Sequence, residues 1–157
     1  MPRKAMVEKR LPVPDPVFDS QLAQRFVNRM MKAGKKSVAQ RLFYHAIELL
    51  KERAKQQDPI DIFNRAVRNV TPLLEVKARR VGGSTYQVPI EVKQSRGAAL
   101  AIQWIITNSR KRPGRTFSER LSAELVDAAA GTGASVRKKD ETHKMAEANK
   151  AFAHYRY

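Results

Sequence analysis

Apolar side chains recur every three or four positions along most of this chain, which is the spacing of helices with one buried face. The pattern predicts six helices, at approximately residues 20–33, 37–55, 59–70, 94–107, 117–130 and 135–154. Asp58 followed by Pro59 marks the start of the third helix, and Thr116 with Glu119 forms a capping box at the fifth. Asp19 is expected to cap the first helix.

The hydrophobic period changes from helical to two between residues 73 and 92. Apolar residues occupy even-numbered positions in two runs, at 74–78 and 86–92, on both sides of a Gly-Gly pair at 82–83. A hairpin keeps all of these side chains on one face only if paired positions sum to an even number. The pattern therefore predicts an antiparallel hairpin with a loop of odd length, at residues 81–83 or 81–85, and not a two-residue turn.

Together these elements predict a mainly α fold in a single domain of residues 1–157. It has a six-helix, bundle-like body and a protruding two-stranded β-hairpin, residues 73–92, between the third and fourth helices. Residues 1–18 are basic and then interrupted by alternating prolines, so they are expected to form an extended N-terminal arm. The last helix and tail, residues 134–157, have the weakest apolar stripe and are expected to be peripheral. That stripe runs through Glu141, Met145, Ala148 and Phe152.

The net charge of the chain indicates which kind of partner it binds. The 157 residues include 31 Lys and Arg against 15 Asp and Glu, a formal charge of +16, while 42% of them are hydrophobic. A chain with this many hydrophobic residues can form a core. Its positive charges repel one another, and binding to a polyanion reduces that repulsion most easily. The absence of cysteine excludes disulfide scaffolds and Cys-ligated zinc sites. No secretion signal is visible, and no apolar run approaches the roughly 20 residues of a membrane span, so nucleic acid is the leading partner.

Catalytic and cofactor motifs are not recognisable in the sequence. Residues 34–37 (GKKS) resemble part of a phosphate-binding loop, but Arg29 stands where that motif needs a glycine. Lys36 stands where it needs Ser or Thr. The three histidines are not spaced as metal ligands. We therefore expect no enzymatic activity, no cofactor and no metal.

Basic residues gather in segments from which side chains can reach phosphates without unpacking a core. They are Arg3, Lys4, Lys9 and Arg10 in the arm; Lys32, Lys35 and Lys36 between the first two helices; Lys77, Arg79 and Arg80 on the hairpin; and Lys93, Arg96, Arg110, Lys111, Arg112 and Arg115 in a stretch without acids between Glu91 and Glu119. Any one of these lysines could equally be a solvated surface residue. As clusters, and without the aromatic strips of sequence-reading RNA domains, they favour recognition of folded RNA by shape and phosphate contacts.

Three segments have sequences specific enough to identify a family. The first runs from DSQL at residues 19–22 through FVNRMM at 26–31 and GKK at 34–36 to LFYHA at 42–46. The second is the hairpin sequence RRVGG at 79–83 with YQVP at 86–89, and the third is THKMAEANKAFAHYR at 142–156. These segments, and with them nearly the whole chain, resemble the family of the seventh protein of the small ribosomal subunit, in its bacterial or organellar form.

The resemblance implies a structural constituent of the 30S subunit in the cytoplasm, with no membrane partner and no obligate homo-oligomer. It implies direct, early binding to the 3′ major domain of 16S rRNA, nucleation of head assembly and contacts with neighbouring head proteins. The basic residues of the arm, of the turn between the first two helices and of the acid-free stretch would bind rRNA. The hairpin would present Lys77, Arg79, Arg80, Gly82 and Gly83 to exit-site tRNA and mRNA. At the C-terminus, Lys144, Tyr155, Arg156 and Tyr157 would contact tRNA or a neighbouring protein.

A free-standing DNA-binding or architectural protein is the alternative reading of the charge. Residues 42–70 could form a helix-turn-helix unit. The second of those helices begins with Asp58 and Asp61, however, and acids are a poor face for a DNA groove. The nucleic acid that copurifies at moderate salt distinguishes the two.

Overall fold

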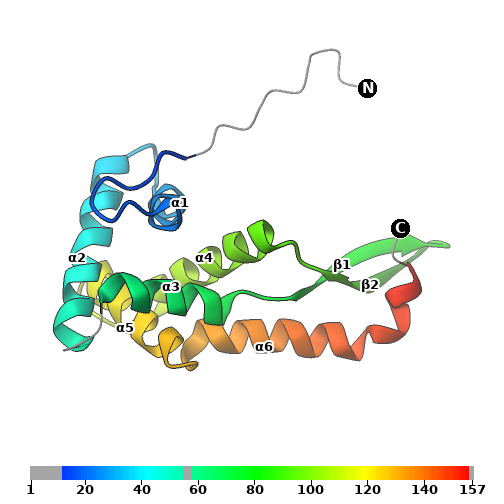
Figure 1. Cartoon of the computed structure of the whole chain (residues 1–157). Coiled ribbons are helices and arrows are strands. Elements are labelled where there is room, and N and C mark those ends of the chain that lie inside the picture. The colour runs from blue at the N-terminus through cyan, green and yellow to red at the C-terminus, as the bar shows by residue number, and fades with distance from the viewer. Residues whose placement is uncertain (1–11, 55–57, 156–157) are drawn as a thin grey trace, which may run out of the picture.

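The computed structural model of the protein describes residues 12–54 and 58–155 (Figure 1). In chain order the elements are α1 (Gln21–Met30), α2 (Lys36–Ala54), α3 (Pro59–Val70), β1 (Leu74–Val81), β2 (Ser84–Glu91), α4 (Gln94–Lys111), α5 (Phe117–Ala129), α6 (Gly133–Ala148) and the 3-10 helix η1 (Lys150–Tyr155). The predicted fold class is therefore confirmed, with the hairpin between α3 and α4. The predicted contacts Arg3, Lys4, Lys9, Arg10, Arg156 and Tyr157 lie outside the described residues.

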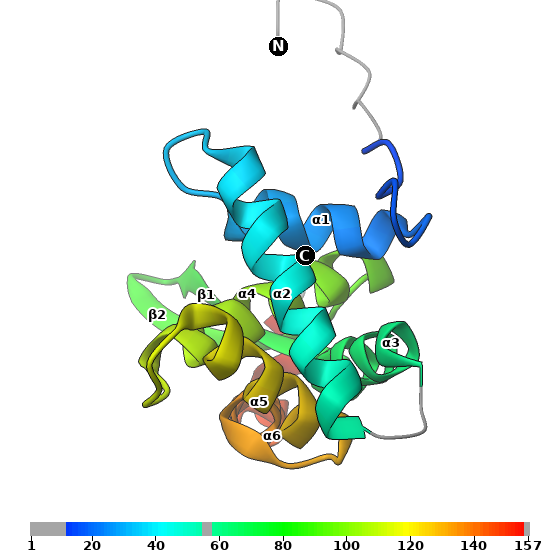
Figure 2. The same cartoon turned by 90° about the vertical axis from the view of Figure 1, so that its left-hand side faces the viewer.

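The helices form a body from which the hairpin projects to one side (Figure 1). Helices α3, α4 and α5 lie in the middle of this body, and α2 crosses one end of it (Figures 1 and 2). Helix α6 runs from the body along the hairpin, and η1 brings the chain back onto the hairpin near its tip (Figure 1). Within residues 12–54 and 58–155, every helix is too short or too polar to cross a bilayer.

The centre of the body is a cluster of three phenylalanine rings that joins the first three helices. The ring centroids of Phe26 and Phe43 are 5.5 Å apart, those of Phe43 and Phe63 5.5 Å, and those of Phe26 and Phe63 5.4 Å. All three side chains are fully buried. Buried residues of α4 and α5, such as Ile105 and Leu125, belong to the same core. Burial of this much apolar surface fixes the relative positions of the helices.

The N-cap residues that the sequence predicts are correct at two helices and wrong at one. Oδ1 of Asp58 accepts from the backbone N–H of Ile60 at 3.0 Å, so the predicted cap of α3 is confirmed. The capping box of Thr116 and Glu119 is present at α5. At α1 the prediction of Asp19 is wrong: Ser20 caps the helix, with Oγ accepting from Ala23 N at 3.3 Å. Asp19 instead lies in the left-handed region, with φ at 45°, in the turn that leads into the helix.

The hairpin turn corrects the prediction of an odd-length loop. Val81 pairs with Ser84, so Gly82 and Gly83 form a two-residue turn with φ of 57° and 88°. Two glycines adopt these positive angles without steric cost, and this turn matches the twist of the strands. The turn geometry therefore overrides the alternation of apolar positions. As a result Val88 of β2 pairs with Lys77 of β1 and shares a face with it.

The C-terminal segment also differs from its prediction. The α-helix ends at Ala148, and η1 continues as a tighter 3-10 turn, where one helix had been expected to His154. The buried side of α6 is formed by Ser135, Val136, Thr142 and Ala146, and the expected stripe residue Met145 is 47% exposed. The stripe is displaced because α6 packs against β1 as well as against α4 and α5. The described part of this segment thus supports the hairpin.

Candidate nucleic-acid interface

A basic groove of about 350 Å³ lies between α1 and the N-terminal half of α4. Arg25 and Arg29, one turn apart on the exposed side of α1, and Arg96 of α4 contribute its three cations. Arg29 donates from Nη2 to Oε1 of Gln103 on α4 at 2.7 Å, which holds its guanidinium across the groove. Sequence reasoning did not select Arg25 or Arg29. Their spacing of four positions, on the side of α1 that its apolar residues leave exposed, is the signal that could have identified them.

A second basic groove, of about 340 Å³, lies where the α1–α2 turn meets the end of α4 and the start of α5. Lys32 and Lys35 come from the turn, Arg110 from α4 and Arg120 from α5. Among residues 12–54 and 58–155, no carboxylate lines either groove. The structure thus brings Lys32 and Lys35 together with Arg110, which is far from them in the sequence, in one groove.

Hydrogen bonds to backbone carbonyls hold two of these cations in place. Arg110 donates from Nη2 to the carbonyl of Met30 at 3.2 Å. Arg120 donates from Nη1 to the carbonyl of Arg110 at 3.1 Å and from Nε to that of Thr116 at 3.2 Å. Because carbonyl oxygens carry no net charge, both guanidinium groups keep their positive charge while losing rotamer freedom. Arg120 was missed because nothing in its sequence context distinguishes it from a solvated residue of α5.

The structure gives Arg96 a partner inside the protein. Its Nε donates to both carboxylate oxygens of Glu75 at 2.9 Å, and Nζ of Lys77 lies 3.3 Å from the same carboxylate. The hydrogen bond from Arg96 holds the pKa of Glu75 below its ordinary value of 4.5, while burial of the carboxylate opposes this and Lys77 adds to it. The Arg96 side chain is still 53% exposed, so it remains at the rim of the first groove.

Arg112 also has partners inside the protein. Its Nη1 lies 3.0 Å from Oε2 of Glu124, and its Nη2 lies 2.6 Å from Oδ2 of Asp127. The Glu124 side chain is only 2% exposed, and its other oxygen accepts from the backbone N–H and the hydroxyl of Ser135 at 3.0 and 2.6 Å. Arg112 thus joins the end of α4 to α5 and, through Glu124, to the start of α6. This geometry makes it a structural residue of the body.

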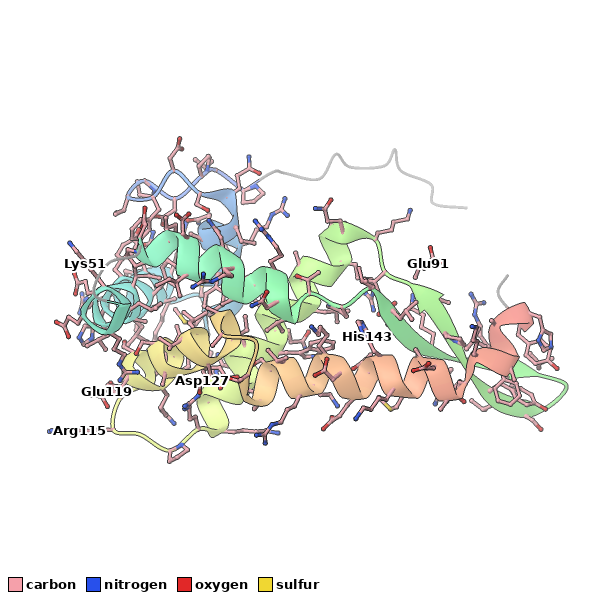
Figure 3. The ribbon with its side chains drawn as sticks, turned by 60° about the horizontal axis from the view of Figure 1, so that its bottom comes forward. Lys51, Glu91, Arg115, Glu119, Asp127 and His143 are labelled. Atoms are coloured by element: carbon pink, nitrogen blue, oxygen red, sulfur yellow. The ribbon has the colours of Figure 1, made fainter. Side chains whose placement is uncertain are left out.

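The other predicted rRNA contacts lie on the surface. Lys36, Lys93, Lys111 and Arg115 are exposed. Arg115 extends outward from the loop between α4 and α5 (Figure 3). On the hairpin, Lys77, Arg79 and Arg80 are exposed along β1, and Gly82 and Gly83 form the exposed tip. The structure therefore separates a basic surface on the body from a basic strand on the hairpin.

Aromatic residues of the C-terminal segment hold the hairpin rather than a free surface. The Tyr86 ring of β2 lies 5.2 Å from that of Phe152 and 5.4 Å from that of Tyr155, centroid to centroid. Lys144 is exposed on α6. At the base of the hairpin, Nε2 of His143 accepts from the backbone N–H of Leu73 at 3.1 Å; Figure 3 shows His143 on α6. Of the predicted C-terminal contacts, Tyr155 is thus half-buried against the hairpin.

In the described part of the chain, no three His, Asp or Glu side chains gather in a way that could hold a metal ion. Buried side-chain polar atoms there all have hydrogen-bond partners. The arrangement that stands out is therefore the pair of carboxylate-free basic grooves, which is suited to binding phosphates.

Comparison with known proteins agrees with this description. A family model described as ribosomal protein S7p/S5e matches residues 2–150. The chain is 58% identical to small ribosomal subunit protein uS7 of Acaryochloris marina over 157 residues, which is 100% of both chains. It is 57% identical to small ribosomal subunit protein uS7c of Paulinella chromatophora and 52% identical to small ribosomal subunit protein uS7 of Thermomicrobium roseum, again over 100% of both chains.

Proposed function

The chain belongs to the ribosomal protein S7p/S5e family and is a structural, RNA-binding protein of the small ribosomal subunit, not an enzyme. From that premise we propose that it binds the 3′ major domain of 16S rRNA directly and nucleates assembly of the subunit head. The cytoplasm is its proposed location, and neighbouring head proteins are its proposed protein partners.

The observation that carries this proposal is the pair of grooves, which in the part of the chain that the structure describes together present seven Lys or Arg side chains and no carboxylate. One groove lies beside the N-terminal half of α4 and the other beside its C-terminal end. We call the side of the body that carries both grooves, from Arg25 on α1 to Arg110 on α4, the α1–α4 surface. Two separate grooves on one rigid body suit an RNA in which several helices converge, because each groove can hold a different backbone. A single DNA duplex would need one continuous basic face.

The hairpin supports a second part of the proposal, that its tip approaches exit-site tRNA and mRNA. It projects from the body, and Arg79, Arg80 and the Gly82-Gly83 turn are exposed at its far end. Backbone without side chains at a tip can come close to a nucleic-acid strand. Lys144 on α6 lies on the segment that supports the hairpin and is proposed to contact tRNA or a neighbouring protein.

Equilibrium binding at several salt concentrations tests the first part. The chain is titrated with a transcript of the 3′ major domain, with a transcript of another 16S rRNA domain and with duplex DNA of similar length. We expect the 3′ major domain to bind at least about tenfold more tightly than either control, each factor of ten being about 1.4 kcal/mol. Equal affinity for all three would contradict the proposal, and preference for the duplex would favour the DNA-binding alternative.

Removal of the hairpin tip, residues 81–85, tests the second part. The body has its own core and grooves, so the helical circular dichroism and the affinity for the 3′ major domain should stay unchanged. Subunits that contain the shortened chain should bind exit-site tRNA less tightly or hold mRNA less accurately. Loss of the helical signal would show that the tip is a structural element instead.

A further inference from the structure

A groove of a different character lies farther along α2, toward its C-terminal half, than the basic groove that contacts the start of α2. It has a volume of about 500 Å³. Val17 and Phe18 line it before α1, Tyr44 and Ile47 line it on α2, and Pro59 lines it at the start of α3. We call this the α2–α3 groove. Its lining differs from those of the basic grooves in its charge, because it includes the carboxylates Glu48 and Asp58.

A network of hydrogen bonds makes one wall of the α2–α3 groove rigid. The buried Asp15 accepts from the backbone N–H groups of Val17 and Phe18 at 3.2 Å through one oxygen and from the Tyr44 hydroxyl at 2.8 Å through the other. Burial of the hydroxyl, and then the hydrogen bond to Asp15 and its charge, raise the pKa of Tyr44 from its ordinary value of 10.0 to about 12, so the hydroxyl stays a donor in alkaline solution as well as at neutral pH. The Phe18 ring packs edge-on against those of Phe43 and Tyr44. The groove is therefore formed before anything binds in it.

The same segment exposes apolar side chains that the rest of the described chain mostly buries. Val17 is 62% exposed at the edge of the groove, and Val13 beside it on the chain is 78% exposed. A rigid apolar groove with exposed valines next to it is the feature that marks interaction surfaces on soluble proteins.

Charge decides which kind of partner fits. Glu48 and Asp58 lie at the rim of the groove with Lys51, and Glu52 and Asp61 follow one turn later on the same two helices. Among the described residues, Glu48, Glu52 and Asp61 take part in no ion pair. Phosphates would meet these carboxylates at close range, which disfavours RNA. A polypeptide with its own cation would complement them.

We propose that the α2–α3 groove docks a segment of a neighbouring protein of the small subunit. That segment carries a large aliphatic or aromatic anchor side chain next to a Lys or Arg. The anchor fills the groove against Phe18 and Ile47, and the cation pairs with Glu48 and Asp58 at the rim. The inference rests on the chain's place in the small ribosomal subunit. It assigns protein docking to one end of the body and RNA binding to the α1–α4 surface.

Photo-cross-linking in purified 30S subunits tests this. Val17 is replaced by p-benzoylphenylalanine, and incorporation of the chain into subunits is measured first; failure to incorporate would count against the proposed function and not against the groove. After irradiation, mass spectrometry should find one ribosomal protein joined through one peptide, with a large apolar residue within a few positions of Lys or Arg. A cross-link to rRNA, to another part of the same chain or to several proteins equally, or no cross-link, would overturn the proposal.

A charge reversal provides the second measurement. Added to the photoreactive chain, Glu48→Lys should lower the yield of the specific cross-link about fivefold, because an attractive rim contact becomes a repulsive one. The matched control is Glu147→Lys, a reversal of an exposed acid on α6, which should leave the yield unchanged. Equal yields from both variants would contradict the role of the rim carboxylates.

Discussion

The body of this protein is stabilised by its own hydrophobic core, whereas the hairpin is stabilised by other elements that pack against it. The body has a shared core in which Phe26, Phe43 and Phe63 are fully buried and in ring contact. The hairpin has two strands, and its buried apolar residues are Val88 and Pro89, both on β2. An isolated pair of strands is marginal in water. The hairpin therefore depends on what packs against it: Arg96 of α4, His143 of α6 and the rings of η1.

The difference separates a rigid binding surface on the body from an element that extends away from the body. The grooves of the α1–α4 surface lie on a body whose core fixes their cations in place, and this suits a contact made with folded RNA. The hairpin extends far from that core and is steadied along its length by α6 and η1 (Figure 1). Variants that affect one region and not the other test this division.

The largest effect is expected in the body core. Phe43→Ala removes a buried ring that contacts four other aromatic rings, and it should lower the free energy of unfolding by about 3–5 kcal/mol. Chemical denaturation of the free protein measures this. The control Val38→Ala, on the same helix but 47% exposed, should change stability by no more than about 0.5 kcal/mol. Similar losses from both variants would mean that the ring cluster is not the centre of the body.

A large effect is also expected from Arg112, although the sequence placed this residue in the RNA interface. Arg112→Ala leaves the buried Glu124 carboxylate without its ion-pair partner, which should cost about 3 kcal/mol of stability. Because the side chain is occupied inside the body, the salt dependence of RNA binding should stay the same. The matched control is Arg115→Ala in the same exposed loop, which should leave stability unchanged. A variant that keeps its stability but binds RNA more weakly would show that Arg112 contacts RNA and is not a structural residue.

A smaller and local effect is expected where the hairpin meets the C-terminal segment. Tyr86→Ala removes two ring contacts and should lower the free energy of local opening of the hairpin by about 1–3 kcal/mol. Hydrogen exchange at β1 and β2 amides measures this, while amides of α2 and α5 should keep their protection. Met145→Ala on the exposed side of α6 is the control. Loss of protection throughout the body would show that the two regions unfold as one unit.

The smallest effect depends on pH. Because the pKa of Glu75 is lowered in the folded protein, its contribution to stability is complete above the ordinary value of 4.5 and is lost as the pH falls through the lowered value. Hydrogen-exchange protection at the base of the hairpin should therefore fall as the solution is acidified below pH 4.5. Glu75→Gln, which cannot ionise, should start with weaker protection and show less dependence on pH. An unchanged pH profile in this variant would exclude the Glu75–Arg96 pair as the cause.

The sequence predicted the order and type of the elements because their signals are local. Asp58 and the Thr116 capping box act within one turn of a helix, and both are found where the sequence places them. The hairpin loop was predicted wrongly because the alternation argument assumed that only one face is buried. In the structure, Val88 shares a face with Lys77, and the buried Glu75 on that face is stabilised by Arg96, a partner 21 positions away.

The sequence selected some of the cations that line the two grooves and missed others. Lys32, Lys35 and Arg110 were selected by clustering along the chain, and folding brings them into one groove. Arg25 and Arg29 were missed because they do not lie in a cluster of basic residues along the sequence. They become part of a basic groove only when α4 packs beside α1. Arg112 was selected for its neighbours in sequence, although its partners Glu124 and Asp127 come from the next helix. Clusters of basic residues in the sequence indicate where positive charge lies, but they do not show which of these side chains form ion pairs inside the protein.

The most direct test of this division is the salt dependence of binding to the 3′ major domain of 16S rRNA by two matched double variants. Arg25→Ala with Arg29→Ala removes two cations from the groove of the body, and Arg79→Ala with Arg80→Ala removes two from the hairpin. The body variant should reduce the slope of log affinity against log salt by about 1.4–1.8, the loss of two phosphate contacts, and the hairpin variant should leave it unchanged. A reduced slope in the hairpin variant with an unchanged slope in the body variant would contradict the account.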